Sequence, residues 1–120
     1  MSIIIPGIDV EKGLELYGGE LDFYVFALRS WFNNTPPVLD VLRNISAETL
    51  DEYIIKIHGV KGTSAHIGAE EIREKAAKLE ELAKAGDLEG VLALNEPLIK
   101  QVEALLEIVK DWLEKNAPEE

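Results

Sequence analysis

Apolar residues recur at helical spacing along nearly the whole chain, and this periodicity constrains the fold more than any other feature. No stretch shows the sustained alternation of apolar and polar residues that marks a strand. The pattern predicts helices over about 10–17, 20–33, 47–63, 69–85 and 88–115, with a shorter helical turn over 38–45. Because short turns join these amphipathic segments, we expect an all-α fold, an antiparallel up-and-down four-helix bundle with an additional short N-terminal helix.

Capping residues and prolines place the expected ends of these helices. Asp9, Ser46 and Asp87 each stand where a side-chain oxygen can cap the first turn of a predicted helix. The Pro36-Pro37 pair predicts a helix boundary, because proline disfavours the helical conformation in the residue before it. Pro97 lies inside the last predicted helix and is expected to kink it or to split it near residues 94–96.

The charge balance limits the partners that the chain can have. The 120 residues include 12 Lys and Arg against 23 Asp and Glu, which gives a formal net charge of −11. Such a surface repels phosphate backbones and anionic lipid headgroups, so nucleic acids and membrane surfaces are not expected partners. The sequence has no cysteine, which excludes disulfides, thiol nucleophiles and metal centres built on cysteine. It also has no secretory signal pattern and no apolar stretch of roughly eighteen residues. We therefore expect a cytoplasmic protein, with one domain over residues 1–120, that works as a monomer.

Two glycines interrupt a segment that its apolar period predicts to be regular helix. Gly59 and Gly62 each cost on the order of 1 kcal/mol relative to alanine in a helix interior. A helix that carries two such costs within four residues usually has a packing or functional reason for them. The segment that contains both glycines is therefore the first place to look for a functional site.

His58 stands directly before these glycines. At 100° per residue it lies about 80° from the centre of the buried stripe, at the solvent edge of the helix. Gly62, four residues on, leaves room beside the ring, and Lys61, three residues on, brings an ammonium within reach. A nearby cation helps to hold an imidazole neutral and nucleophilic, and it offsets the charge of a bound phosphoryl group. The residues alone are compatible with a phosphohistidine site and with an ordinary surface histidine, and they leave both interpretations open.

The segment that begins at His58 also carries a longer pattern. Its residues are His58, Lys61, Gly62, Thr63, Ser64, Gly68 and Ala69. This pattern resembles the signature of the histidine-containing phosphotransfer (HPt) domains of bacterial and fungal phosphorelays. The flanks are similar to that family at Gly7-Ile8-Asp9-Val10, Gly13, Gly18-Gly19 and Ala85-Gly86-Asp87-Leu88. The resemblance covers residues 7–114, with Val60 in place of leucine and Thr63 in place of serine as mild departures.

The resemblance implies roles for individual residues. His58 corresponds to the histidine that is phosphorylated, and Lys61 to the lysine that balances the phosphate charge. Gly62 corresponds to the glycine that opens the surface for a receiver domain. Glu80 falls where many members carry Glu or Gln near the imidazole, and it could accept a ring N–H and orient the other nitrogen. Glu81 is adjacent, so the alternative for Glu80 is a solvated acid.

The resemblance also implies partners and a reaction. Family members accept a phosphoryl group from an aspartyl phosphate on one receiver domain and pass it to the aspartate of another. The expected partners are response-regulator receiver domains and a sensor or hybrid histidine kinase, with Mg²⁺ on the receiver and no cofactor or metal on this chain. No phosphate-binding glycine loop is present, so ATP-dependent kinase activity is not expected. The expected receiver-docking residues are Ile55, Gly59, Gly62 and Ala65.

Two other classes of function use helical bundles of this size. A helical-bundle adaptor without catalysis could bind partner helices or receivers, and Gly59 and Gly62 would then be close-packing sites. A di-iron bundle requires Glu-x-x-His pairs. Ile55 and Thr63 stand three residues before His58 and His66, so the spacing excludes that class.

Overall fold

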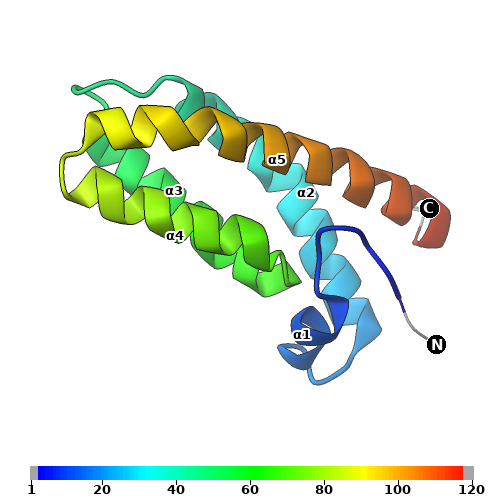
Figure 1. The fold of residues 1–120 in the computed structure, drawn as a ribbon. Helices are drawn as coiled ribbons and strands as arrows, with labels where there is room; N and C mark the ends of the chain where they lie inside the picture. Colours follow the sequence, from blue (N-terminus) through cyan, green and yellow to red (C-terminus); the bar gives the residue numbers. More distant parts are fainter. Residues whose placement is uncertain (1–2, 118–120) are drawn as a thin grey trace.

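The computed structural model of the chain describes residues 3–117. Its helices are α1 (Val10–Glu15), α2 (Leu21–Arg43), α3 (Leu50–Ile67), α4 (Glu70–Lys84) and α5 (Leu88–Asn116). Helices α2 to α5 pack in a closed ring of neighbours, each against the next along the chain and α5 against α2. The short α1 contacts one end of α2 and α3, as Figure 1 shows. The predicted all-α bundle with an additional N-terminal helix is therefore confirmed.

The core of the bundle is made by the apolar stripes of the helices. The largest fully buried side chains are Tyr24, Tyr53, Ile5, Leu28, Leu42, Ile57, Ile67, Leu79, Leu98, Ile99, Val91 and Val102. Most of these side chains lie at the helical spacing that the sequence predicts. Their apolar surface is removed from water in the core, and this burial stabilises the bundle. No helix among residues 3–117 has both the length and the apolar run needed to cross a membrane.

Helix α2 continues through Pro36 and Pro37 to Arg43, so the boundary predicted there is wrong and residues 38–43 of the predicted turn over 38–45 belong to α2. An interior proline costs about 3 kcal/mol, because it removes a backbone donor and crowds the preceding turn. The buried face nevertheless runs on through both prolines, and its residues are Leu28, Trp31, Thr35, Leu39 and Leu42. Packing along this continuous face outweighs the local preference of the two prolines.

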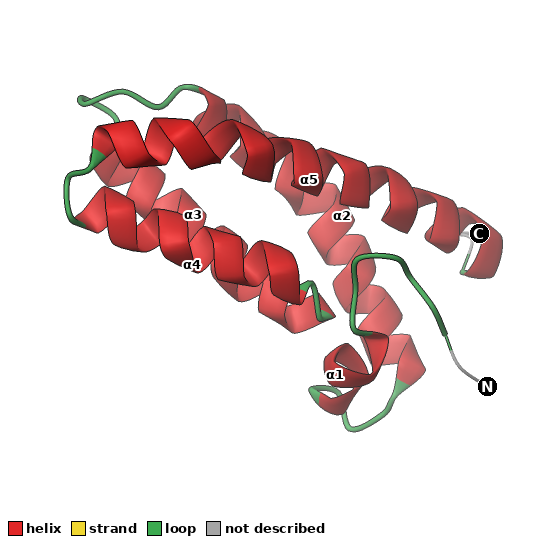
Figure 2. Ribbon diagram, in the orientation of Figure 1, coloured by secondary structure: helices red, strands yellow, loops and turns green. Residues whose placement is uncertain are grey.

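The segment between α2 and α3 forms the longest connection within the bundle (Figure 2). Helix α3 begins at Leu50 and ends at Ile67, so it starts and ends later than the predicted 47–63 helix. Ser46 is not the N-cap, because the N-cap position belongs to Thr49. The backbone N–H of Ser46 instead donates to Thr49 Oγ1 at 2.9 Å, within the turn.

The remaining predicted helix starts agree with the structure. The side chain of Asp9 accepts a hydrogen bond from the backbone N–H of Lys12, and that of Asp87 accepts one from Gly90. Helix α5 runs unbroken through Pro97, so the predicted split near residues 94–96 is absent.

The start of α1 and the first turn of α2 close the C-terminal end of α3, where the last carbonyls lack partners within the helix. The hydroxyl of Tyr24 donates to the carbonyl of Ile67 at 2.7 Å. The backbone N–H of Asp9 donates to the carbonyl of Gly68 at 2.8 Å. Gly68 ends α3 in the left-handed conformation with φ of 81°. A Cβ at Gly13 would lie 2.5 Å from the Tyr24 ring and 2.9 Å from the Ile67 carbonyl oxygen, so this close approach requires glycine.

Candidate functional site

His58 lies in the middle of α3 with its ring turned toward solvent. Its side chain is 65% exposed, so the predicted accessibility of the ring is confirmed, although the ring lies farther from the buried stripe than the predicted 80°. The buried positions of α3 fall on the opposite side, at Tyr53, Ile57, Val60, Ser64 and Ile67. The helical period therefore decides which face carries the core and leaves the imidazole accessible to a partner.

Glu80 brings a buried carboxylate from α4 against this ring. Its Oε2 atom lies 2.8 Å from Nδ1 of His58, although the Glu80 side chain is only 6% exposed. The neighbouring Glu81 is exposed. The contact between His58 and Glu80 that the resemblance implies is therefore present, and the alternative of a solvated acid at position 80 is wrong.

Two lysines complete the surroundings of Glu80. Lys61 Nζ lies 2.6 Å from Oε1, and Lys84 Nζ lies 3.1 Å from Oε2. The hydrogen bond from Lys61 is the largest cause that lowers the pKa of Glu80 from 4.5 to about 2, with further contributions from Lys84 and His58 against the opposing effect of burial. The carboxylate is therefore ionised at neutral pH.

An ionised carboxylate only accepts hydrogen bonds, and this fixes the arrangement of the ring. Nδ1 of His58 carries the proton that it donates to Glu80. In the neutral ring the lone pair then lies on Nε2. The site thus presents a nucleophilic nitrogen whose tautomer is set by a buried partner.

Lys84 is a site residue that the sequence reasoning did not identify. It stands four residues after Glu80, so both side chains lie on the same face of α4. The four-residue spacing of Glu80 and Lys84 predicts an ion pair on one helix face. It points to the site only once Glu80 is known to be buried against α3. Lys61, which the sequence did single out, has its ammonium on Glu80 in this structure.

Gly59 and Gly62 lie beside His58 on an open surface. A Cβ added at either position would meet no atom of another element within 4 Å in the described part of the chain. Packing within the bundle therefore does not require glycine at these positions, and the close-packing interpretation is wrong. Both glycines instead leave the backbone bare where an approaching partner would meet it.

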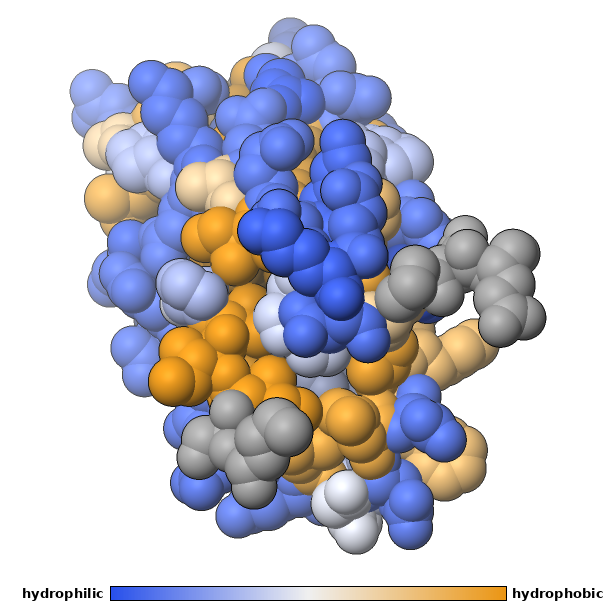
Figure 3. Space-filling model, turned by 90° about the vertical axis from the view of Figure 1, so that its right-hand side faces the viewer, coloured by the Kyte–Doolittle hydropathy of each residue, from blue (hydrophilic) through white to orange (hydrophobic). Residues whose placement is uncertain are grey.

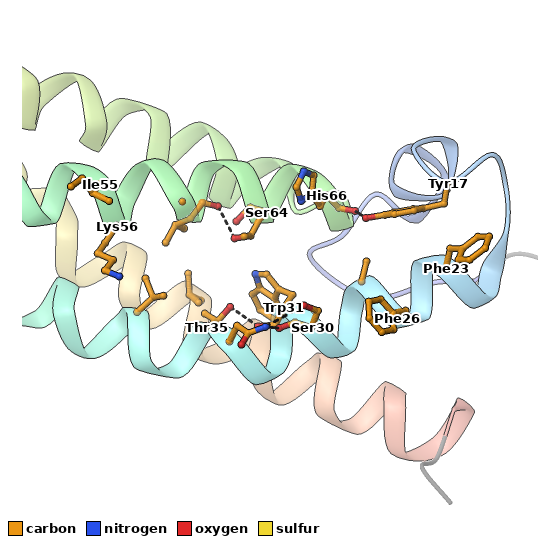
Figure 4. Close-up of a pocket in the computed structure, with 17 residues that line it drawn as sticks. Tyr17, Phe23, Phe26, Ser30, Trp31, Thr35, Ile55, Lys56, Ser64 and His66 are labelled. Atoms are coloured by element: carbon orange, nitrogen blue, oxygen red, sulfur yellow. Dashed lines mark hydrogen bonds between the residues drawn. The ribbon is translucent and has the colours of Figure 1, made fainter.

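A cavity of about 590 Å³ lies between α2 and α3 on the side of Ile55 and Gly59 (Figure 4). Ile55 is 69% exposed at this cavity, and Phe26 of α2 is 74% exposed. Of the predicted docking residues, Ile55 and Gly59 line the cavity, whereas Gly62 and Ala65 do not. The sequence analysis did not identify Phe23 and Phe26. They could have been found as two aromatic residues that fall outside the buried stripe of α2.

A second apolar area lies at the end of the molecule where the N-terminal segment meets α5. Figure 3 faces this end and shows apolar residues gathered on it. A cavity of about 410 Å³ there is lined in part by Ile4, Pro6, Ile108 and Trp112, and it shares no lining residue with the cavity beside Ile55. Among residues 3–117, no three His, Asp or Glu side chains are grouped so that they could hold a metal ion.

The fold and the site together define a helical-bundle domain that presents one oriented imidazole to a partner. The family model for the Hpt domain matches residues 27–112. The chain belongs to the Hpt domain family, which is the family that its histidine motif resembles.

A curated relative agrees with this assignment. The chain is 30% identical over 95 residues to the phosphorelay intermediate protein rdeA of Dictyostelium discoideum. The match covers 78% of this chain and 37% of the relative, so the chain spans little more than a third of that protein's length. No solved structure matches the chain.

Proposed function

We propose that the chain is a phosphorelay intermediate that carries a phosphoryl group on His58. One observation carries the proposal: an exposed imidazole has its Nδ1 held at 2.8 Å by the buried carboxylate of Glu80, which leaves Nε2 free to react. Membership of the Hpt domain family and similarity to a phosphorelay intermediate protein support the same role.

The proposed reaction follows from the arrangement of the ring. Nε2 of neutral His58 attacks the phosphorus of a receiver's aspartyl phosphate in line, the N–P bond forms, and the P–O bond to the aspartate breaks. The aspartate leaves as a carboxylate. Glu80 stabilises the positive charge that develops on the ring through the proton on Nδ1. The reverse step delivers the phosphoryl group to the aspartate of a second receiver.

The remaining chemistry comes from Lys61 and from the partner. Lys61 lies one turn from His58 and supplies positive charge beside the site where the phosphoryl group binds. Mg²⁺ belongs to the receiver, where it neutralises charge on the transferred group. The chain itself acts as a carrier without ATP-dependent kinase activity, and it works as a monomer in the cytoplasm.

Receiver domains dock over the face that carries His58 and the cavity between α2 and α3. Ile55 and Gly59 belong to this docking surface together with Phe23 and Phe26, because all four line the same cavity. Exposed aromatic side chains next to a bare backbone are typical of the centre of a protein interface. A sensor or hybrid histidine kinase supplies the phosphoryl group through its own receiver.

Transfer of labelled phosphate tests the proposal. The chain is incubated with a receiver domain that carries ³²P on its aspartate in the presence of Mg²⁺. We expect label on the chain that is lost in acid and stable in base, as a phosphoramidate is. His58→Gln abolishes the label, and His66→Gln, which changes an exposed histidine at the end of the same helix, retains it. Label that survives His58→Gln would overturn the proposal, and receiver binding without transfer would favour the adaptor.

A further inference from the structure

Two donors from different helices share one oxygen of Glu80. Oε2 accepts the hydrogen bond from Nδ1 of His58 at 2.8 Å, and it pairs with Nζ of Lys84 at 3.1 Å. The other oxygen, Oε1, pairs with Lys61 at 2.6 Å. Because both partners lie on Oε2, the Lys84 ammonium and the His58 ring nitrogen are at most about 6 Å apart.

The charges around the ring decide its protonation. A lone carboxylate beside an imidazole favours the imidazolium form, which has no lone pair on Nε2 and cannot attack phosphorus. Here the single negative charge of Glu80 is paired with two ammonium groups, so the cluster that faces His58 is positive overall. Helix α4 supplies Glu80 and Lys84, and α3 supplies Lys61. In the described part of the chain, α1, α2 and α5 add no hydrogen bond or ion pair to these groups.

The two lysines differ in where they act. Lys61 pairs with Oε1 rather than with the oxygen that accepts from the ring, and it stands one turn from His58 where it can also reach a bound phosphoryl group. Lys84 pairs with the oxygen that the ring itself contacts. Its charge therefore opposes imidazolium formation at the atom that the ring contacts, and its ion pair helps to hold Oε2 beside Nδ1.

We propose that Lys84 is a positioning residue of the phosphotransfer site, which holds Glu80 against His58 and keeps the imidazole in its neutral, nucleophilic form. This inference rests on the proposed function, because it assigns to Lys84 a part in the transfer to His58. Lys84 acts through Glu80.

The pH dependence of transfer separates this role from a general structural one. In Lys84→Met, the pH at which the transfer rate is half of its plateau rises by about half to one unit, the size expected from one charge about 6 Å away in partly exposed surroundings. At high pH the ring is neutral in both proteins, and the plateau rate falls in Lys84→Met because Glu80 is no longer held against His58. Lys84→Arg restores the original profile, because the guanidinium supplies the same charge.

Lys100→Met is the matched control. Lys100 is an exposed lysine of α5, so this variant makes the same change in net charge without touching the cluster. Its pH profile coincides with that of the unsubstituted chain.

Nitrogen NMR of the His58 ring gives a second readout that needs no receiver. In the unphosphorylated chain, we expect the titration of the ¹⁵N ring signals to move to higher pH in Lys84→Met by the same amount as the rate profile. A titration that does not move, or a plateau rate that falls at every pH while the midpoint stays, would overturn the role of Lys84. If the unsubstituted chain accepts no phosphoryl group, the proposed function fails, and the NMR titration still decides whether Lys84 keeps the ring neutral.

Discussion

At the scale of single residues, the site depends on a buried carboxylate that is kept ionised. Glu80 is almost fully buried, yet donors from His58, Lys61 and Lys84 hold its pKa near 2. The histidine and Lys61 could be predicted from the helical period and from the resemblance to the family. The full set of contacts could not, because it depends on how α4 lies against α3.

The ionisation of Glu80 predicts how the stability of the chain depends on pH. Folding lowers the pKa of Glu80 from 4.5 to about 2, so its stabilising effect is complete above pH 4.5 and is lost as the pH falls toward 2. We expect Glu80→Gln to remove this part of the acid sensitivity. Urea unfolding between pH 7 and pH 2.5 measures it. Glu81→Gln, at the exposed neighbouring acid, retains the full acid sensitivity, and equal curves for both variants would contradict the account.

Gly62 predicts a separation of stability from function. Because a Cβ there meets no atom of another element within 4 Å, Gly62→Ala gains helix propensity, and we expect the free energy of unfolding to rise by about 1 kcal/mol. The added methyl group stands where a receiver approaches, so receiver affinity falls by about tenfold, or about 1.4 kcal/mol. Urea unfolding and a binding titration measure the two effects. A less stable variant would show that Gly62 is needed for packing.

At the scale of helices, local signals predicted which segments are helical better than where the helices end. The apolar period identified each helix, because the same spacing that buries a stripe also builds the core. The helix end predicted at Pro36 and Pro37 is wrong, since packing along a continuous buried face outweighs the cost of two prolines. The helix start predicted after Ser46 is also wrong, because the N–H of Ser46 donates to Thr49 Oγ1 in a turn that precedes α3.

At Gly13, unlike at Gly62, an added Cβ has no room, because α1 lies close to the end of α3 there. Its Cβ would lie 2.5 Å from the ring of Tyr24 and 2.9 Å from the carbonyl oxygen of Ile67, so Gly13→Ala must displace α1. We expect a loss of about 1–3 kcal/mol in the free energy of unfolding, the size of a typical overpacking substitution. Urea unfolding beside Gly62→Ala measures it. A Gly13→Ala variant as stable as the unsubstituted chain would contradict the close approach.

At the scale of the whole molecule, the bundle places His58 on the same helix as two residues that line an apolar cavity, Ile55 and Gly59. Neither α2 nor α3 alone makes this surface, because Phe23 and Phe26 come from α2, whereas Ile55 and Gly59 come from α3. The sequence could not predict the cavity for that reason. The glycines and Ile55 were predicted as docking residues, but the aromatic side chains opposite them required the packing of the two helices.

The docking surface predicts that an aromatic residue remote from the chemistry contributes to receiver affinity. Phe26 is 74% exposed, so Phe26→Ser changes the stability of the bundle little. We expect it to weaken receiver binding by about tenfold, because a large aromatic at the centre of an interface costs about 1–2 kcal/mol when it is truncated. Calorimetric titration with the receiver measures the affinity. Leu92→Ser, at an exposed apolar residue of α5 outside the cavity, leaves binding unchanged, and equal losses in both variants would contradict this docking surface.

The central claim is that Nε2 of His58 takes the phosphoryl group while Nδ1 stays on Glu80. The most direct measurement is ³¹P and ¹⁵N NMR of the chain after transfer from a phosphorylated receiver. We expect one phosphoramidate signal, coupled to Nε2 of His58, with the proton retained on Nδ1. A phosphoryl group on Nδ1 of that ring, on His66 or on a carboxylate would contradict the account.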